Sequence, residues 1–327
     1  MDKIRRWFLE TVEGRTLFAF IVLLIVPWIV PNAYTLNVSI LILIFLICDM
    51  GQNIVMGYSG QLSVAGAALM GIGAYTAAIL VNEGLPFEVS VIAALLLSSL
   101  LGCLLGILTF RVKTHYVLLI TIGFHETVLV LLNNLLDLTG GSSGMPIRPV
   151  KLFGAISLSD RTAFYYFTLV VSLLFLYIAF KIRRSKLGLT MLAIRDHEKG
   201  ALSLGINAVK YRVIAMTLGS LFSGVAGILL GFLTGFLAPT MFSMHKALLL
   251  ILVVVLGGMG SNRGLIVASV FMTVVSQYLN QFVEVSMMIY GAVIIAVLLF
   301  APGGIEALLA TVVLLRKKRR MAGADSS

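Results

Sequence analysis

The sequence predicts an all-α membrane protein with about ten transmembrane or re-entrant helices and both termini in the cytoplasm. Of its 327 residues, 60% are hydrophobic and 12% are charged, whereas soluble domains carry about 25% charged residues. Several apolar segments exceed the ~18 residues that can cross a bilayer. Most of the 24 Lys and Arg residues lie in four segments that are separated by even numbers of apolar spans. This is the distribution that the positive-inside rule gives for cytoplasmic segments.

The apolar segments set the expected order of the chain. Residues 1–16 form a basic amphipathic N-terminus, residues 17–315 the membrane domain, and residues 316–327 a basic cytoplasmic tail. The first apolar run lacks a cleavage site of small residues, so we expect it to be retained as a span. The ten expected spans are Leu17–Tyr34, Leu36–Gly57, Gly57–Leu80, Val89–Phe110, Tyr116–Leu136, Ala163–Ile182, Val213–Leu237, Ala247–Leu256, Leu265–Phe282 and Met287–Phe300.

A polar stretch, Lys181–Arg212, interrupts the apolar chain and must therefore lie in water. Within it, Asp196 suits the N-cap of a short helix, Glu198 its first turn, and Gly205 the position after its C-terminus. The helix between them has about two turns, which is too short to be stable alone. We therefore expect a docking helix for a soluble partner protein.

Polar residues inside the second and third expected spans mark a second region of interest. Asn53 lies within the second span, and residues 57–60 (Gly-Tyr-Ser-Gly) indicate either a helix break or a tight turn. At this depth such residues face protein or a water-filled path rather than lipid. Both readings stay open: hydrogen bonds to neighbouring helices, or contact with a substrate in transit. Ser59 and Ser63 also begin a helix face of small residues at every fourth position.

The seventh expected span carries small residues at i+4 spacing, which favours close helix packing. They are Gly219, Ser223, Gly227, Gly231 and Gly235.

Several kinds of chemistry find no support in the sequence. It contains no G-x-x-x-x-G-K-[ST] motif for ATP, and its four His residues have no metal-ligand spacing. Cys48 and Cys103 lie in apolar spans and offer no disulfide framework. We expect no catalysis, no metal and no cofactor in this chain. Its basicity indicates orientation in the membrane rather than a nucleic-acid partner.

With these segments taken together, the chain resembles the LivM-type permease subunits of branched-chain amino-acid ABC importers over almost its whole length. Two positions depart from the pattern, because Lys199 stands where the EAA…G motif of importer permeases has Glu, and Leu265 stands where the family often has Pro. The matching stretches are Asn53–Gln61, Gly71–Tyr75, Leu138–Gly144, Ala193–Asp196, Ala201–Asn207, Gly257–Ser261 and Phe300–Gly304.

The resemblance implies a multi-pass protein of the bacterial cytoplasmic membrane. Its implied partners are a second homologous permease of the LivH type, two cytoplasmic ATPase subunits and an extracytoplasmic substrate-binding protein. The polar helix would then be the coupling helix that enters an ATPase groove, through residues Arg195, Asp196, Glu198, Lys199, Gly200, Ala201 and Gly205. The ATPase partners, not this chain, would hydrolyse ATP.

Candidate residues of the substrate path follow from the need of an amino-acid zwitterion for polar groups within the membrane. They are Asn53, Ser59, Gln61, Ser63 and Glu126.

Three alternative functions stay open. The same importer architecture could carry urea, a short amide, a sugar or another small polar solute. A stand-alone secondary transporter needs ion-coupling residues, but Asp49 and Glu126 are the only acidic candidates in the expected spans. A purely structural membrane subunit is the third alternative.

Overall fold

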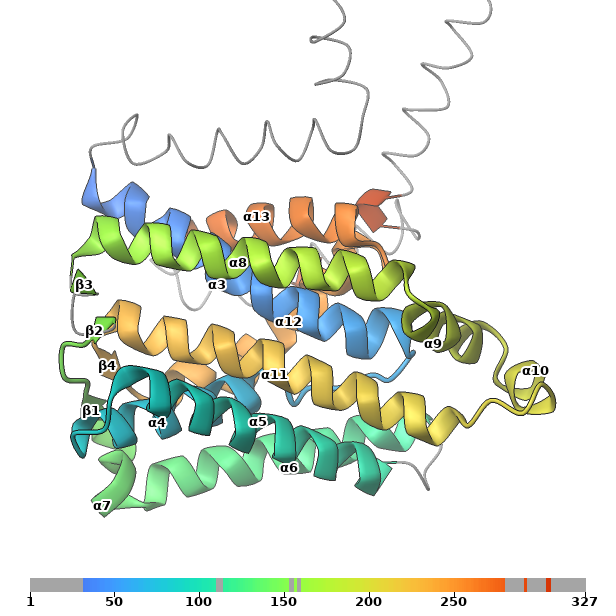
Figure 1. Ribbon diagram of the computed structural model, residues 1–327, viewed down its shortest axis with the longest axis horizontal. Helices are drawn as coiled ribbons and strands as arrows, with labels where there is room; N and C mark the ends of the chain where they lie inside the picture. Colours follow the sequence, from blue (N-terminus) through green and yellow to red (C-terminus); the bar gives the residue numbers. More distant parts are fainter. Residues whose placement is uncertain are drawn as a thin grey trace, which may run out of the picture.

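The computed structural model describes residues 32–109, 114–152, 156–157, 160–279, 291–292 and 304–306. The expected N-terminal segment 1–16, nearly all of the first and tenth spans, the basic turn 111–113 and the tail 316–327 lie outside these residues. The described part is an α-helical bundle whose long helices lie side by side along one direction (Figure 1).

Among the described residues, eight helices correspond in sequence to the second to ninth expected spans. Six helical stretches are long and apolar enough to cross a membrane, and the 17-residue α4 is a shorter apolar helix. The π-helical turn η1 continues α3, and the re-entry into α4 follows it. The elements are α3 Ala33–Asn53, η1 Ile54–Tyr58, α4 Gly66–Asn82, α5 Phe87–Thr109, α6 Thr114–Asn134, α8 Arg161–Arg184, α11 Ala208–Thr234, α12 Met244–Gly257 and α13 Asn262–Leu279.

Helix α11 lies at the centre of the bundle and packs against α3, α4 and α5. Its small residues explain this, because backbones approach where side chains are short. A Cβ on Gly219 would lie 3.0 Å from the Gly51 carbonyl oxygen, and one on Gly227 would collide with the carbonyl of Met70. The Ser223 hydroxyl lies 3.7 Å from the Cys48 thiol. The packing stripe predicted from the sequence is thus present on α11.

The predicted packing role is wrong for one residue of the stripe, Gly235. Gly235 lies after the end of α11 with φ +67°, and a Cβ there would have no neighbour within 4 Å. It ends the helix in a left-handed conformation instead of packing. Gly224, which the i+4 spacing omits, makes a close contact: a Cβ on Gly73 of α4 would lie 2.7 Å from its Cα.

Short strands, which the all-α prediction did not include, close one end of the bundle. β1 (Met145–Pro146) pairs antiparallel with β4 (Phe236–Leu237), and β2 (Lys151–Leu152) pairs with β3 (Ile156–Ser157). The short helices α7 (Leu136–Thr139), η2 (Gly141–Ser143) and η3 (Pro239–Phe242) lie at the same end. Asn82 ties the end of α4 to this region, because its amide donates to the Pro146 carbonyl at 2.9 Å and accepts from the Arg148 N–H at 3.0 Å.

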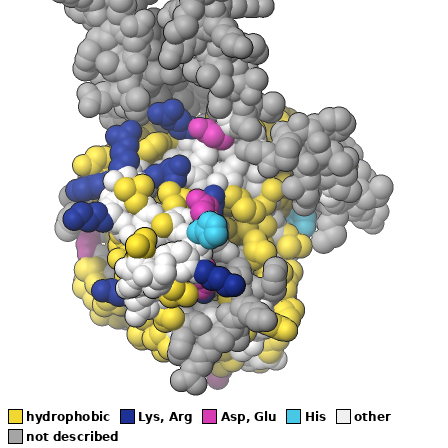
Figure 2. All heavy atoms as spheres, turned by 90° about the vertical axis from the view of Figure 1, so that its right-hand side faces the viewer, with side chains coloured by type: hydrophobic (Ala, Val, Ile, Leu, Met, Phe, Trp, Pro, Cys, Tyr) yellow, Lys and Arg dark blue, Asp and Glu magenta, His cyan; other side chains and the backbone are white. Residues whose placement is uncertain are grey.

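The opposite end carries two short helices in the polar stretch, α9 (Lys186–Asp196) and α10 (Glu198–Ser203). Asp196 is therefore the last residue of α9 and not an N-cap, which corrects the sequence prediction. His197 takes the N-cap position of α10 without a side-chain hydrogen bond. Gly205 does lie just beyond α10 with φ +77°. Figure 2 looks onto this end and shows Lys and Arg side chains spread around it, with hydrophobic side chains between them.

Candidate functional site: a junction of helix breaks

Helix α3 does not end cleanly at the α9–α10 end of the bundle. It passes into the π-helical turn η1, after which residues 59–65 contain no helix until α4 begins at Gly66. Gly60 turns the chain with φ +72°. Non-helical backbone at membrane depth needs partners from the protein, and π-turns recur at functional positions. The structure has a helix break at residues 57–60, one of the two alternatives that the sequence left open. The predicted helical face through Ser59 and Ser63 is wrong, because neither residue is helical.

A second break lies between α12 and α13, and Asn53 joins the two. Its side-chain oxygen accepts from the Gly260 N–H at 2.9 Å, and its amide donates to the Asn262 side-chain oxygen at 3.2 Å. The Tyr58 hydroxyl donates to the same Asn262 oxygen. Asn53 and Tyr58 are fully buried. Since a buried amide left unpaired is costly, these bonds hold the two breaks together.

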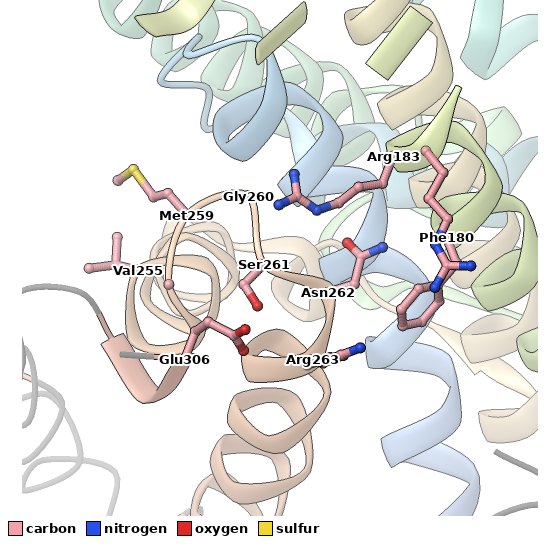
Figure 3. A pocket seen from close by; sticks show the side chains of 11 residues that line it. Phe180, Arg183, Val255, Met259, Gly260, Ser261, Asn262, Arg263 and Glu306 are labelled. Atoms are coloured by element: carbon pink, nitrogen blue, oxygen red, sulfur yellow. The ribbon is translucent and has the colours of Figure 1, made fainter. Parts of the chain in front are cut away.

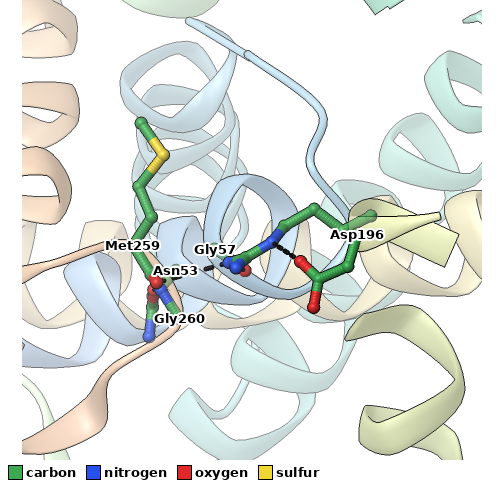
Figure 4. Close-up of polar contacts among 6 residues, drawn as sticks. Asn53, Gly57, Asp196, Met259 and Gly260 are labelled. Atoms are coloured by element: carbon green, nitrogen blue, oxygen red, sulfur yellow. Dashed lines mark hydrogen bonds and ion pairs between the residues drawn. The ribbon is translucent and has the colours of Figure 1, made fainter. Parts of the chain in front are cut away.

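Arg195, near the end of α9, contacts both breaks. Figure 4 labels the residues around these contacts, Gly57 and Met259 in the breaks and Asp196 beside Arg195. Its Nη1 donates to the Gly57 carbonyl of η1 and, at 3.3 Å, to the Met259 carbonyl between α12 and α13. Its Nε lies 3.0 Å from Asp196 Oδ1, which fixes the guanidinium from the other side. One side chain from the end of α9 thus contacts two irregular segments of the helix bundle.

Glycines make room for this guanidinium. A Cβ on Gly60 would lie 2.7 Å from Arg195 Cγ, and a Cβ on Gly260 would lie 2.9 Å from Arg195 Nη1. A Cβ on Gly57 would collide with the Asn53 amide and the Gly260 nitrogen. The glycine-rich sequences on either side of the junction therefore serve close approach, not flexibility alone.

A second connection runs from α10 to the same region. Glu198 forms an ion pair with Arg212 at the start of α11, at 2.9 Å. The Arg212 carbonyl accepts from the Gln61 amide at 3.1 Å, and Gln61 also donates to the Ser59 hydroxyl at 2.7 Å. Ser59 in turn donates to the Val55 carbonyl of η1 at 2.8 Å. Hydrogen bonds thus link α10 to the break after α3.

The re-entrant segment is also held at its far end. The Gln52 amide donates to the Ser63 carbonyl, and the Ser63 hydroxyl accepts from the Ala65 N–H at 3.3 Å. The Thr121 hydroxyl of α6 accepts from the Val64 N–H at 3.2 Å. The segment between η1 and α4 is therefore fixed to α3, α6 and α11.

The structure brings four of the five predicted path residues together. They lie within or beside the break after α3, are at most 3% exposed, and have protein partners: Asn53, Ser59, Gln61 and Ser63. Glu126 lies apart from them, on an exposed part of α6 beside the buried His125. Contact of any of the five with a substrate stays a prediction.

The predicted coupling residues all lie on or beside α9 and α10. Lys199 and Gly200 are exposed, whereas Ala201 is buried among Ile194 and Ala208 and holds α10 against its neighbours. Two leucines that the sequence reading passed over, Leu202 and Leu204, are 52% and 80% exposed. Within an otherwise polar stretch, exposed leucines are typical of a docking surface.

Asn262 and Tyr58 are functional candidates that the sequence reading missed. The glycine-rich residues 257–264 are the signal in the sequence that could have indicated Asn262. In the described part of the chain, no group of three or more His, Cys, Asp or Glu side chains has the arrangement of a metal site.

Comparisons with known proteins agree with this architecture. Residues 34–298 match the family described as "Branched-chain amino acid transport system / permease component". The high-affinity branched-chain amino acid transport system permease proteins LivM of Escherichia coli (strain K12) and Salmonella typhimurium (strain LT2) are each 30% identical over 90% of this chain and 76% of their own length. The autoinducer 2 import system permease protein LsrC of Escherichia coli (strain K12 / DH10B) is 25% identical over 88% of this chain and 86% of its length. No solved structure matches the chain. The chain belongs to the family of permease components of branched-chain amino acid transport systems.

Proposed function

We propose that this chain is a permease subunit of an ATP-driven ABC importer, which moves branched-chain amino acids across the bacterial cytoplasmic membrane by alternating access. The family and the similarity to LivM support the cargo class. The observation that carries the mechanism is Arg195, because it joins α9, a helix of the polar stretch, to two breaks in the bundle.

The proposed assembly contains a second homologous permease of the LivH type, two cytoplasmic ATPases and an extracytoplasmic substrate-binding protein. The end that carries α9 and α10 then faces the cytoplasm, and Leu202 and Leu204 enter an ATPase groove. Apolar anchors that are desolvated on docking supply most of the affinity of such contacts. The polar residues Glu198, Lys199 and Gly200 line the contact around them.

Motion of a docked ATPase is transmitted along the two connections. Arg195 pulls on the carbonyls of η1 and of the turn between α12 and α13. Glu198 acts through Arg212 and Gln61 on the segment before α4. Helix breaks bend more easily than intact helices, because part of their backbone ladder is already open. The halves of the bundle that meet at the junction therefore change tilt together.

In the arrangement described here the junction is closed, because its polar groups bond to one another. When the breaks move apart, Asn53, Ser59, Gln61 and Ser63 lose these partners and become available to a zwitterionic amino acid. Glu126 reaches the same path only if its face of α6 meets the partner permease.

Similarity to the autoinducer 2 import permease supports a second cargo class on the same architecture. A short amide, urea or another small polar solute would use the same junction, with selectivity set largely by the binding protein. A stand-alone secondary transporter would leave the exposed leucines and the Arg195 link without a role.

The test is uptake by proteoliposomes that contain this chain with its partner permease, ATPases and binding protein. ATP-dependent accumulation of labelled leucine that cold isoleucine suppresses, while urea and ribose do not, supports the branched-chain cargo. If another solute stimulates the ATPase activity and leucine is not taken up, the chain is still an importer subunit, but its cargo is not a branched-chain amino acid. Leucine accumulation by vesicles that hold this chain alone contradicts the importer mechanism.

A further inference from the structure

A cavity of about 670 Å³ lies beside the junction, between the end of α8, the turn from α12 to α13 and Glu306 (Figure 3). None of the predicted path residues lines it, although Met259, whose carbonyl accepts from Arg195, does. Its lining residues are Phe180, Arg183, Arg184, Val255, Gly258, Met259, Gly260, Ser261, Asn262, Arg263 and Glu306.

The charges of this pocket are unbalanced. Three arginines, Arg183, Arg184 and Arg263, line it together with one carboxylate, that of Glu306. The ion pairs found among the described residues, Arg195 with Asp196 and Arg212 with Glu198, involve none of the four. A buried nitrogen of Arg183 and a buried oxygen of Glu306 have no hydrogen-bond partner within the described structure. The pocket therefore favours a ligand with negative charge.

Asn262 supplies a second, independent sign of a ligand. It is 3% exposed, and its side-chain oxygen is occupied by Asn53 and Tyr58. Its amide nitrogen is buried and lacks a partner in the described part of the chain. Asn262 is also the first residue of α13, an 18-residue helix whose N-terminus adds positive potential. An unpaired buried donor is costly unless an acceptor binds it.

The apolar walls of the pocket and its position at the end of α8 indicate which kind of anionic ligand it binds. Phe180, Val255 and Met259 provide apolar surface beside the charges. Arg183 and Arg184 form the basic last turn of α8, where a span reaches the headgroup layer. Basic pockets between membrane helices at the cytoplasmic side bind lipid headgroups. Glu306 disfavours a dianion such as inorganic phosphate, but it accepts a hydrogen bond from a headgroup hydroxyl or ammonium.

We propose that this pocket binds the phosphodiester headgroup of a phospholipid from the cytoplasmic leaflet. The phosphoryl oxygens accept from Arg183, Arg263 and the free amide of Asn262. The hydroxyl or ammonium of the headgroup donates to Glu306, and the glycerol and first methylene groups contact Phe180, Val255 and Met259. A bound lipid thereby stabilises the turn between α12 and α13, to which Arg195 also binds.

The proposal is tested by native mass spectrometry of the detergent-purified, delipidated chain in its complex. Phosphatidylglycerol, phosphatidylethanolamine, phosphatidylcholine and inorganic phosphate are added separately. We expect the first two lipids to be retained, and phosphatidylcholine, whose quaternary ammonium cannot donate, to bind about tenfold more weakly. Arg263→Gln removes an exposed charge with little effect on the fold and should lower retention about tenfold. Asn262→Asp keeps the oxygen that accepts from Tyr58 but removes the amide N–H donor, and should lower lipid retention further.

Lys181→Gln is the matched control, because Lys181 lies in the same last turn of α8 as Arg183 and Arg184, is exposed, and does not line the pocket. Equal loss of lipid in Lys181→Gln and Arg263→Gln would show nonspecific attraction and overturn the proposal. So would retention of all three lipids alike, or tighter binding of inorganic phosphate or leucine than of phosphatidylglycerol.

Discussion

At the scale of single residues, Arg195 connects the polar end of the molecule to its membrane core. A guanidinium can hold two carbonyls and a carboxylate at once, because its donors point in fixed, divergent directions. The carbonyls belong to Gly57 and Met259, in two segments that no helix joins directly. With 30% of its side chain exposed, Arg195 lies at the boundary where a docked protein can act on it.

Arg195→Gln should uncouple ATP hydrolysis from transport. Glutamine is too short to reach both carbonyls, and loss of hydrogen bonds from a charged group costs about 1.5–3 kcal/mol each when the site is shielded from water. We expect leucine uptake by the reconstituted complex to fall at least about tenfold, while substrate-independent ATPase activity persists. Lys186→Gln removes an equally exposed charge from the same helix and should leave uptake unchanged. If both variants take up leucine at the original rate, Arg195 does not couple ATP hydrolysis to transport.

Gly57 allows the closest approach in the junction, so Gly57→Ala should destabilise the folded chain. The added methyl collides with the Asn53 amide and the Gly260 nitrogen, and such overpacking costs about 1–3 kcal/mol. The control is Gly123→Ala on α6, where a Cβ meets no atom within 4 Å and helix propensity gains about 0.5–1 kcal/mol. The effect of each substitution is measured as the change in the midpoint of thermal unfolding in detergent. Equal midpoints would show that the junction relaxes around the methyl group.

At the scale of elements, the sequence predicted most helices and the packing face of α11, because apolar length and i+4 spacing act locally. The sequence prediction failed where contacts between residues far apart in the chain determine the local structure. The aspartate at 196 has the chemistry of an N-cap, but the pairing of its neighbour Arg195 with carbonyls across the bundle favours its place at the end of α9. The pairing of β1 with β4 joins residues 145–146 to 236–237, which no local pattern reveals. The Asn262 amide nitrogen, which has no partner among the described residues, is likewise visible only in three dimensions.

Helix α10 should lose its ATPase partners when its apolar tip is made polar. Leu204 is 80% exposed, so Leu204→Asp costs the folded chain little, but it places an unpaired charge in the proposed docking groove. We expect capture of the ATPases by the tagged permease to fall about tenfold or more. Leu138→Asp, at an exposed leucine of α7 at the other end of the bundle, is the control. Unchanged capture with Leu204→Asp would place the docking surface elsewhere.

At the scale of the whole molecule, the two ends of the bundle differ in chemistry. One end carries the basic helix termini and the helices α9 and α10, and the other carries the paired short strands. The apolar faces between them, such as that of α5, expose leucines along a length that matches a bilayer. The proposed orientation, with the α9–α10 end in the cytoplasm, agrees with this asymmetry of charge.

This orientation predicts opposite labelling of two engineered cysteines. In a background with Cys48→Ser and Cys103→Ser, the variants Ser203→Cys on α10 and Glu83→Cys at the strand end each place a thiol at an exposed position. A membrane-impermeant maleimide added to intact spheroplasts should label the Glu83→Cys variant and leave the Ser203→Cys variant unlabelled until the membrane is opened. The reverse order would place the exposed leucines of α10 outside the cell, beyond the reach of any cytoplasmic ATPase, and would reject the proposed coupling. Labelling of both positions in intact cells would show that α10 is reached through an open path, and the closed junction would then not describe the resting protein.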